Sequence, residues 1–133
     1  MHIVKSSQTQ SRSGIGSLRP LLIHPQKIAV RTQEGLLMVS WQDIIRCEAD
    51  SNYTWIFLQQ HKSLLVCKTL GRVQAALPDN YFVRVHQSHL LRLDEISAVT
   101  KETVDLRDGT QVPLARNSRH LLIERLQTIS TFI

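Results

Sequence analysis

The sequence contains little cysteine and no long apolar run. Its two cysteines, Cys47 and Cys67, lie far apart in strand-like apolar stretches, which is neither a CxxC pair nor a disulfide-rich pattern. We therefore expect two reduced, partly buried thiols. No stretch approaches the roughly 18 consecutive apolar residues of a membrane span, and the first residues lack the apolar run of a secretory signal. These absences favour a soluble cytoplasmic protein without a membrane partner.

Motifs for catalysis and for metal binding are also missing. The sequence has no GxSxG, no phosphate-cradling glycine loop, no HExxH and no useful pairing of cysteine with histidine. His86 and His89 are spaced like ligands on a turn, but no third ligand is evident. Asp94 and Glu95 form a pair of acids that fits the capping of the next strand better than catalysis. We expect no enzymatic activity, no metal site and no cofactor.

The positive charge of the chain is unevenly distributed. The 133 residues carry a net charge of +5, but four of the 16 lysines and arginines and none of the 11 acids fall in residues 1–27. The composition of residues 1–26 predicts a flexible basic arm or linker, and residues 27–133 are long enough for one domain. Because this domain is nearly neutral, phosphate binding by it requires local clustering of cations.

Alternating apolar residues predict a hairpin over residues 27–40. A two-residue turn at Glu34-Gly35 would place Val30 opposite Val39, so that the apolar faces of the two strands agree. A short helical turn over residues 41–44 is expected to follow.

A second hairpin is predicted over residues 104–114. A three-residue loop at 107–109, with Gly109 in the left-handed conformation, would place Val104 opposite Val112. We prefer this loop because a two-residue turn would put the apolar residues on opposite faces.

Two short helices are expected. Apolar residues at helical spacing over 70–77 predict the first, with Gln74 outward, and Pro78 ends it. The second begins near Ser118, and either Asn117 or Ser118 can accept hydrogen bonds from the free amides as its N-cap.

The most unusual stretch is a polar turn between two apolar strands. Residues 82–86 and 90–93 have strand patterns, and the sequence His86-Gln87-Ser88-His89 separates them. Binding groups often lie on such connections between rigid elements.

Three blocks of the sequence carry a family resemblance: residues 41–54 (WQDIIRCEADSNYT), residues 82–96 (FVRVHQSHLLRLDEI) and residues 104–117 (VDLRDGTQVPLARN). Together they resemble the LytTR DNA-binding domain of bacterial transcription regulators, over about residues 27–127. The resemblance implies a mainly β fold of elongated, stacked antiparallel sheets and hairpins with one or two short helices.

The same resemblance implies double-stranded DNA as the partner. Loops, not a recognition helix, would enter successive major grooves, and two copies could bind direct repeats as a homodimer. Such domains are the outputs of two-component response regulators, so an upstream receiver domain or a sensor kinase is also implied.

The best candidates for DNA contact by chemistry alone are Arg116, Asn117, Ser118 and Arg119. Arginine can bond to both O6 and N7 of guanine, asparagine does the same for adenine, and serine or a helix N-terminus suits phosphate. The resemblance implies that Arg116 enters the major groove. Without it, a solvated helix cap with two exposed arginines would be the better interpretation.

The resemblance implies two further contact positions. Gln87 occupies one of them, and glutamine can read adenine or bind phosphate. The other falls on Asn52, Tyr53 or Thr54, where a plain turn is nearly as good an interpretation.

Three more residues are weaker candidates. Lys68 and Arg84 are reasonable phosphate contacts, although long cations on strand surfaces are usually only solvated. For His86 we expect a neutral side chain that orients its loop through a hydrogen bond.

Two other functions remain open from the sequence. One is a β-rich interaction or ligand-sensing module, in which Trp41 and Trp55 would line a pocket. The other is nonspecific nucleic-acid binding by the basic arm, residues 1–26.

Overall fold

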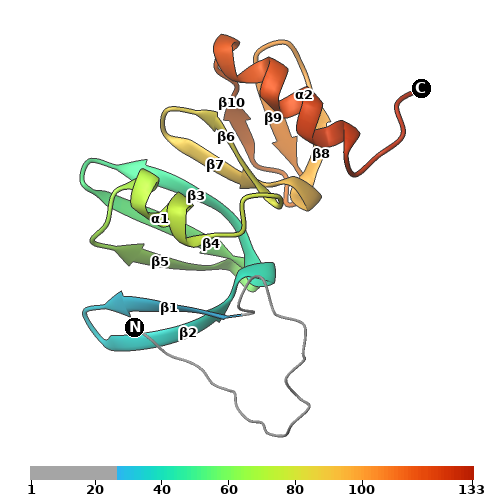
Figure 1. The fold of residues 1–133 in the computed structure, drawn as a ribbon. Helices are drawn as coiled ribbons and strands as arrows, with labels where there is room; N and C mark the ends of the chain where they lie inside the picture. Colours follow the sequence, from blue (N-terminus) through green and yellow to red (C-terminus); the bar gives the residue numbers. More distant parts are fainter. Residues whose placement is uncertain (1–26) are drawn as a thin grey trace, which may run out of the picture.

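The computed structural model describes residues 27–133, which form a mainly β domain (Figure 1). The predicted arm, residues 1–26, lies outside the described residues. In chain order the strands and helices are β1 (Lys27–Thr32), β2 (Gly35–Ser40), β3 (Ile44–Asp50), β4 (Tyr53–Leu58), β5 (Lys62–Val66), α1 (Leu70–Ala76), β6 (Phe82–His86), β7 (His89–Arg92), β8 (Ile96–Val99), β9 (Thr103–Leu106), β10 (Gln111–Pro113) and α2 (Arg119–Gln127). No helix of this part of the chain is long and apolar enough to cross a membrane.

The strands form three antiparallel sheets. Within residues 27–133, a five-stranded sheet has the order β5-β4-β3-β7-β6, a three-stranded sheet has the order β10-β9-β8, and β1 and β2 form a two-stranded sheet. In Figure 1 they are stacked from the β1–β2 hairpin at the bottom, through the five-stranded sheet, to the three-stranded sheet and α2 at the top. The expected fold of stacked antiparallel sheets with two short helices is therefore confirmed.

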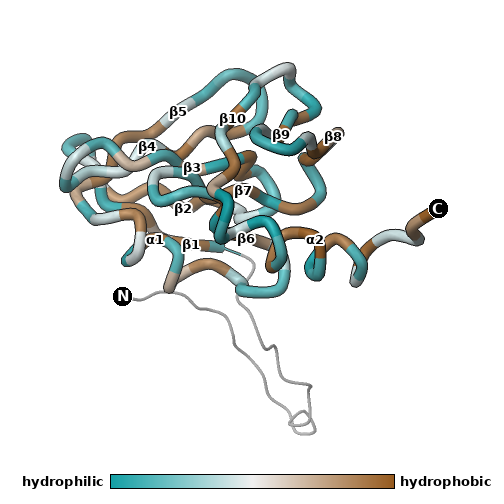
Figure 2. The backbone as a smooth tube through the Cα atoms, turned by 90° about the horizontal axis from the view of Figure 1, so that it is seen from above, coloured by the Kyte–Doolittle hydropathy of each residue, from teal (hydrophilic) through white to brown (hydrophobic). Residues whose placement is uncertain are grey.

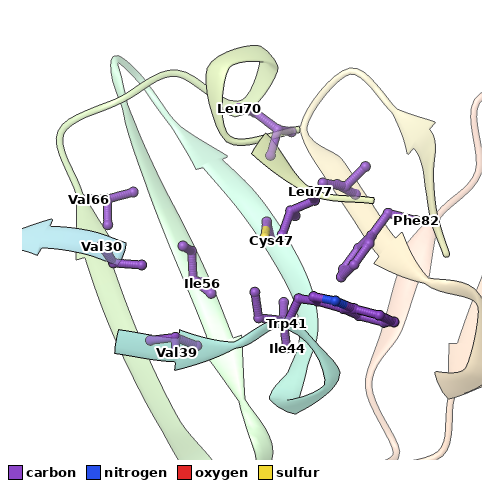
Figure 3. Close-up of a cluster of buried hydrophobic side chains, with 11 residues drawn as sticks. Val30, Val39, Trp41, Ile44, Cys47, Ile56, Val66, Leu70, Leu77 and Phe82 are labelled. Carbon is purple, nitrogen blue, oxygen red and sulfur yellow. The ribbon is translucent and has the colours of Figure 1, made fainter. Parts of the chain in front are cut away.

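Each face of the five-stranded sheet carries its own apolar core, because successive strand residues point to opposite faces. One cluster joins this sheet to α1 and to the β1–β2 hairpin, and Cys47 lies within it between α1 and Trp41 (Figure 3). The other joins β6 and β7 to the three-stranded sheet and α2. In Figure 2, α2 shows both hydrophobic and hydrophilic positions, as expected for a helix packed on one side.

The two cysteines differ in their surroundings. Cys47 is fully buried, and burial raises the pKa of its thiol to about 12. Cys67 is exposed. Both are free, but the expectation that both are partly buried was wrong, because Cys67 follows the end of β5 and is left exposed by the other residues of 27–133.

The register of the first hairpin differs from the prediction by one residue at the turn. Thr32 pairs with Gly35, so Gln33 and Glu34 form the turn, and Val30 faces Leu37 instead of Val39. Because Leu37 and Val39 lie on the same face of the strand, the predicted apolar face is retained.

The second hairpin has the predicted register. Val104 pairs with Val112, and the loop closes through the Gly109 amide, which donates to the Leu106 carbonyl at 3.0 Å. Gly109 has a φ of +92°, a conformation that residues with a Cβ rarely adopt.

The two helices are found where they were expected, with different caps. Thr69 caps α1, where its side chain accepts a hydrogen bond from the Arg72 amide. Ser118 is the N-cap residue of α2, but its side chain makes no capping bond. The 3₁₀ turn Arg116–Ser118 precedes α2, so Ser118 already has helical φ and ψ and the predicted capping bond is absent.

Candidate nucleic-acid interface

Three connections that carry the predicted contact residues lie along one edge of the domain. They are the β3–β4 turn (residues 50–53), the β6–β7 turn (residues 87–88) and the 3₁₀ turn Arg116–Ser118. In Figure 1 the three follow one another along the upper left side, with the β6–β7 turn in the middle. We call them together the three-turn edge.

Two backbone hydrogen bonds tie the outer turns to the middle one. The Ala49 amide donates to the Ser88 carbonyl at 2.9 Å, and the Ala115 amide donates to the Val85 carbonyl at 2.8 Å. Both bonds lie within two residues of the turns that they join. The three turns are therefore held together by backbone hydrogen bonds, not by mobile side chains.

Five of the predicted contact side chains are exposed on this edge. They are Asn52, Tyr53, Gln87, Arg116 and Asn117. Tyr53 keeps 45% of its surface exposed although it belongs to a strand. Arg116 and Asn117 make no side-chain hydrogen bond or ion pair within residues 27–133. Their contact with DNA stays a prediction, but their donors are free to make it.

Thr54 does not fit the prediction of a DNA contact. Its side chain is fully buried, and its hydroxyl donates to the Lys68 carbonyl at 2.7 Å. Strand alternation explains this, because Tyr53 faces solvent at the turn and the next residue must point inward. The same bond holds the exposed Lys68 close to the β3–β4 turn, where its side chain is free to approach a phosphate.

Arg119 anchors the start of α2. Its Nη1 donates to the Thr100 carbonyl at 2.6 Å, which ties the helix to the β8–β9 turn. The neighbouring Ser118 is partly buried. Phosphate contacts by both residues stay predictions, and Arg119 would make one with its remaining donors.

Arg84 was predicted to contact phosphate, but its guanidinium faces the protein. It is partly buried and donates to the carbonyls of His86 and Gln87 and to the side chain of Gln74 on α1. The expectation that Gln74 points outward was therefore wrong. Gln74 and Arg84 lie on different elements that a turn separates. No spacing rule predicts a contact of this kind, so nothing in the sequence indicated it.

The two histidines of the β6–β7 turn have different surroundings. His86 orients the turn as expected, because its Nδ1 accepts a hydrogen bond from the Ser88 amide at 3.0 Å. Nδ1 of His89 is buried and has no hydrogen-bond partner among residues 27–133. Burial lowers the pKa of His89, although Glu48 lies 4.0 Å away and acts in the opposite direction. Burial prevails, since the same Glu48 oxygen is already paired with Arg46 at 2.7 Å. Within residues 27–133, no group of three potential ligands is placed to hold a metal ion.

The two tryptophans do not line a common pocket. Trp41 is buried and stacks on Tyr81 with 4.6 Å between ring centroids. Ile56 and Trp41 belong to the same core cluster. Trp55 precedes Ile56 in β4, so its side chain points to the opposite face of the sheet. Its Nε1 donates to Asp50 at 3.2 Å. The pocket expected for a ligand-sensing module is therefore not formed by these residues.

Comparison with known proteins identifies the family and the fold of the chain. The model of the LytTr DNA-binding domain family matches residues 34–127. A solved LytTr DNA-binding domain, from a Bacillus cereus protein described as a methyl-accepting/DNA response regulator, superposes with a TM-score of 0.65. The two share 20% sequence identity, and the match covers 77% of this chain and 97% of that one, which shows a common fold.

Three curated relatives are regulatory or sensory proteins. The heme-containing CO-sensing transcriptional regulators RcoM 2 and RcoM 1 of Paraburkholderia xenovorans are each 28% identical over 109 residues, 77% of this chain and 40% of theirs. The sensory transduction protein LytT of Bacillus subtilis is 26% identical over 95 residues, 68% of this chain and 39% of its own. The chain thus spans about two fifths of the length of these relatives. Since the family model covers most of the domain, the chain belongs to the LytTr DNA-binding domain family.

Proposed function

We propose that this domain binds double-stranded DNA sequence-specifically by placing its three-turn edge in the major groove, as the output domain of a transcription regulator. The observation that carries the proposal is the combination of free polar side chains and fixed backbone. The side chains of Arg116, Asn117 and Gln87 have no hydrogen-bond partner within residues 27–133, while backbone hydrogen bonds fix the turns that present them. Rigid presentation reduces the conformational entropy lost on binding.

The free side chains have the chemistry of base recognition. Arg116 can bond to O6 and N7 of guanine, and Asn117 and Gln87 can each bond to N6 and N7 of adenine. These atoms are all exposed in the major groove, which gives each base pair a distinct pattern. Three turns along one edge would read separated groups of bases.

Cations beside the turns supply phosphate contacts. Lys68 is exposed near the β3–β4 turn, and Arg119 keeps unused donors at the start of α2. Contacts of this kind set the position of a protein on the duplex without reading sequence, and they make affinity depend on salt.

The family and the names of the curated relatives support a proposal about the wider regulatory role. We propose that a receiver domain or a separate sensor kinase controls this domain in the cytoplasm, and that two copies bind direct repeats. Their names describe transcriptional regulation and sensory transduction, and each relative is more than twice as long as the matched segment.

A selection of genomic DNA fragments at a stated salt concentration tests the proposal. We expect enrichment of one discrete motif, either single or repeated. A second selection with residues 1–20 deleted is the matched control for binding by the basic N-terminal segment. The same motif should be enriched, with lower overall affinity, since Lys5, Arg12 and Arg19 are removed. Random fragments in the first selection, or loss of the motif in the second, would contradict the proposal.

A further inference from the structure

We propose that Arg84 is a positioning residue for base recognition by Gln87. The inference rests on the proposed function, which names Gln87 as a base-reading residue. It assigns Arg84 a role other than phosphate contact, and it brings α1 into the recognition machinery through Gln74.

Arg84 ties the β6–β7 turn to α1 with three hydrogen bonds from three different nitrogens. Its Nε donates to the His86 carbonyl at 3.2 Å, and its Nη2 donates to the Gln87 carbonyl at 2.6 Å. Its Nη1 donates to Oε1 of Gln74 at 3.0 Å. The first two bonds hold consecutive carbonyl groups of the turn, so the peptide that carries the Gln87 side chain is held from the inside.

Both backbone groups of Ser88 are also hydrogen-bonded. The Ser88 amide donates to Nδ1 of His86, and the Ser88 carbonyl accepts from the Ala49 amide. The β6 strand has an irregular register between Arg84 and His86, so the regular ladder alone does not hold this end of the hairpin. Only the Gln87 side chain is left exposed at the tip. The Arg84 bonds add to the ladder at this irregular point and orient the peptide that carries that side chain.

Only arginine can make this set of contacts. A guanidinium has a planar fork of five N–H donors, whereas a lysine ammonium carries its donors on one atom. The three partners of Arg84 are neutral oxygens, so its positive charge is not neutralised by them. Arg84→Lys therefore removes the fork and retains the charge, which separates positioning from phosphate contact.

The test measures the affinity of the Arg84→Lys variant for its selected site and for a nonspecific duplex of equal length. We expect the ratio of the two affinities to fall about tenfold, since hydrogen bonds from a charged donor are lost. Nonspecific affinity and the slope of affinity against salt should stay unchanged. If Arg84 instead contacted phosphate, the affinity ratio of Arg84→Lys should stay unchanged, because the lysine ammonium can also bind phosphate. Arg72→Lys, on the exposed side of α1, is the matched control and should leave both quantities unchanged.

A second measurement needs no DNA. Amide hydrogen exchange at Ser88 and Ala49 should become faster in Arg84→Lys and in Gln74→Ala, while exchange in the two cores stays unchanged. Gln74→Ala keeps Arg84 and serves if the lysine variant does not fold. An unchanged affinity ratio or unchanged exchange would overturn the inference. Absence of a preferred site in the unmodified protein would overturn the proposed function instead, and the exchange experiment would still decide whether Arg84 holds the turn.

Discussion

The two ends of the β6–β7 hairpin differ in whether their polar side chains are buried and paired or exposed and unpaired. At the end away from the turn, Arg92 and Glu95 are each only 6% exposed and pair at 2.9 Å. Arg92 also donates to the Ile44 carbonyl at 2.7 Å and to Asp94 at 2.9 Å. At the turn end, Gln87, Arg116 and Asn117 are exposed, and their side chains have no hydrogen-bond partner within residues 27–133.

This difference indicates which polar side chains stabilise the fold and which are available to bind another molecule. A buried cation must find internal partners, because an unpaired buried charge is costly. An exposed cation without partners contributes little to stability and remains available to a ligand. Arginine on its own therefore indicates neither role, and its partners decide.

The largest expected effect is on stability at the closed end. Arg92→Ala leaves Glu95 buried without its cation, and we expect the free energy of unfolding to fall by about 3–5 kcal/mol. Urea unfolding monitored by circular dichroism measures this loss. Replacing both partners, with Arg92→Met and Glu95→Leu together, should recover much of it. A loss of unfolding free energy below about 1 kcal/mol in Arg92→Ala would show that the buried pair is no more important for stability than the exposed side chains at the turn.

The next effect is on recognition at the open end. Arg116→Ala should reduce discrimination between correct and mismatched bases by about 1–3 kcal/mol, because one paired contact to a base is removed. Its unfolding free energy should change by less than about 0.5 kcal/mol, since the Arg116 side chain has no hydrogen-bond partner among residues 27–133. Binding to matched and mismatched duplexes measures the first quantity. Arg107→Ala, an exposed arginine whose amide bonds to Glu95 at the closed end, is the control and should leave discrimination intact.

The smallest effect is a pH dependence that arises at the turn end. Burial lowers the pKa of His89 from its ordinary value of 6.5, so the unfolded chain takes up a proton more readily than the folded one. The stability contributed by neutral His89 is complete above pH 6.5. It is lost as the pH falls from there through the folded-state pKa, by at most about 1.4 kcal/mol per pH unit.

Unfolding curves between pH 7.5 and 5 measure this dependence. His89→Gln should flatten the stability profile in that range, whereas substitution of the exposed His61 by glutamine should not. If the His89 variant retained the whole slope, another group would be responsible and the buried, unpaired nitrogen would have no measurable consequence.

Local sequence rules accounted for much of the fold. The Val104–Val112 register was predicted because a left-handed glycine and a three-residue loop leave one arrangement that keeps the apolar residues on one face. The turn of the first hairpin was predicted one residue too late. A turn at Gln33-Glu34 and a turn at Glu34-Gly35 both leave the apolar residues of the two strands on one face, so the pattern could not distinguish them. The apolar pattern determines which face of a strand is buried, but it does not determine which residue of the next strand each residue pairs with.

Candidate contact residues were less predictable than strands. The family resemblance pointed to the turns, and their exposed members include Gln87 and Arg116. It also suggested Thr54, which strand alternation buries, and Arg84 was proposed only as a surface cation.

The sequence by itself determined the order of strands and turns, the two short helices and the apolar face of each hairpin, because these depend on neighbours a few residues apart. Only the tertiary structure decided which polar side chains are free. The partners of Arg84 and Arg119 on other elements, Gln74 and the Thr100 carbonyl, come from segments that only folding brings close. Arg116 has the same chemistry and remains unpaired within residues 27–133, because no segment of this part of the chain provides it with a partner.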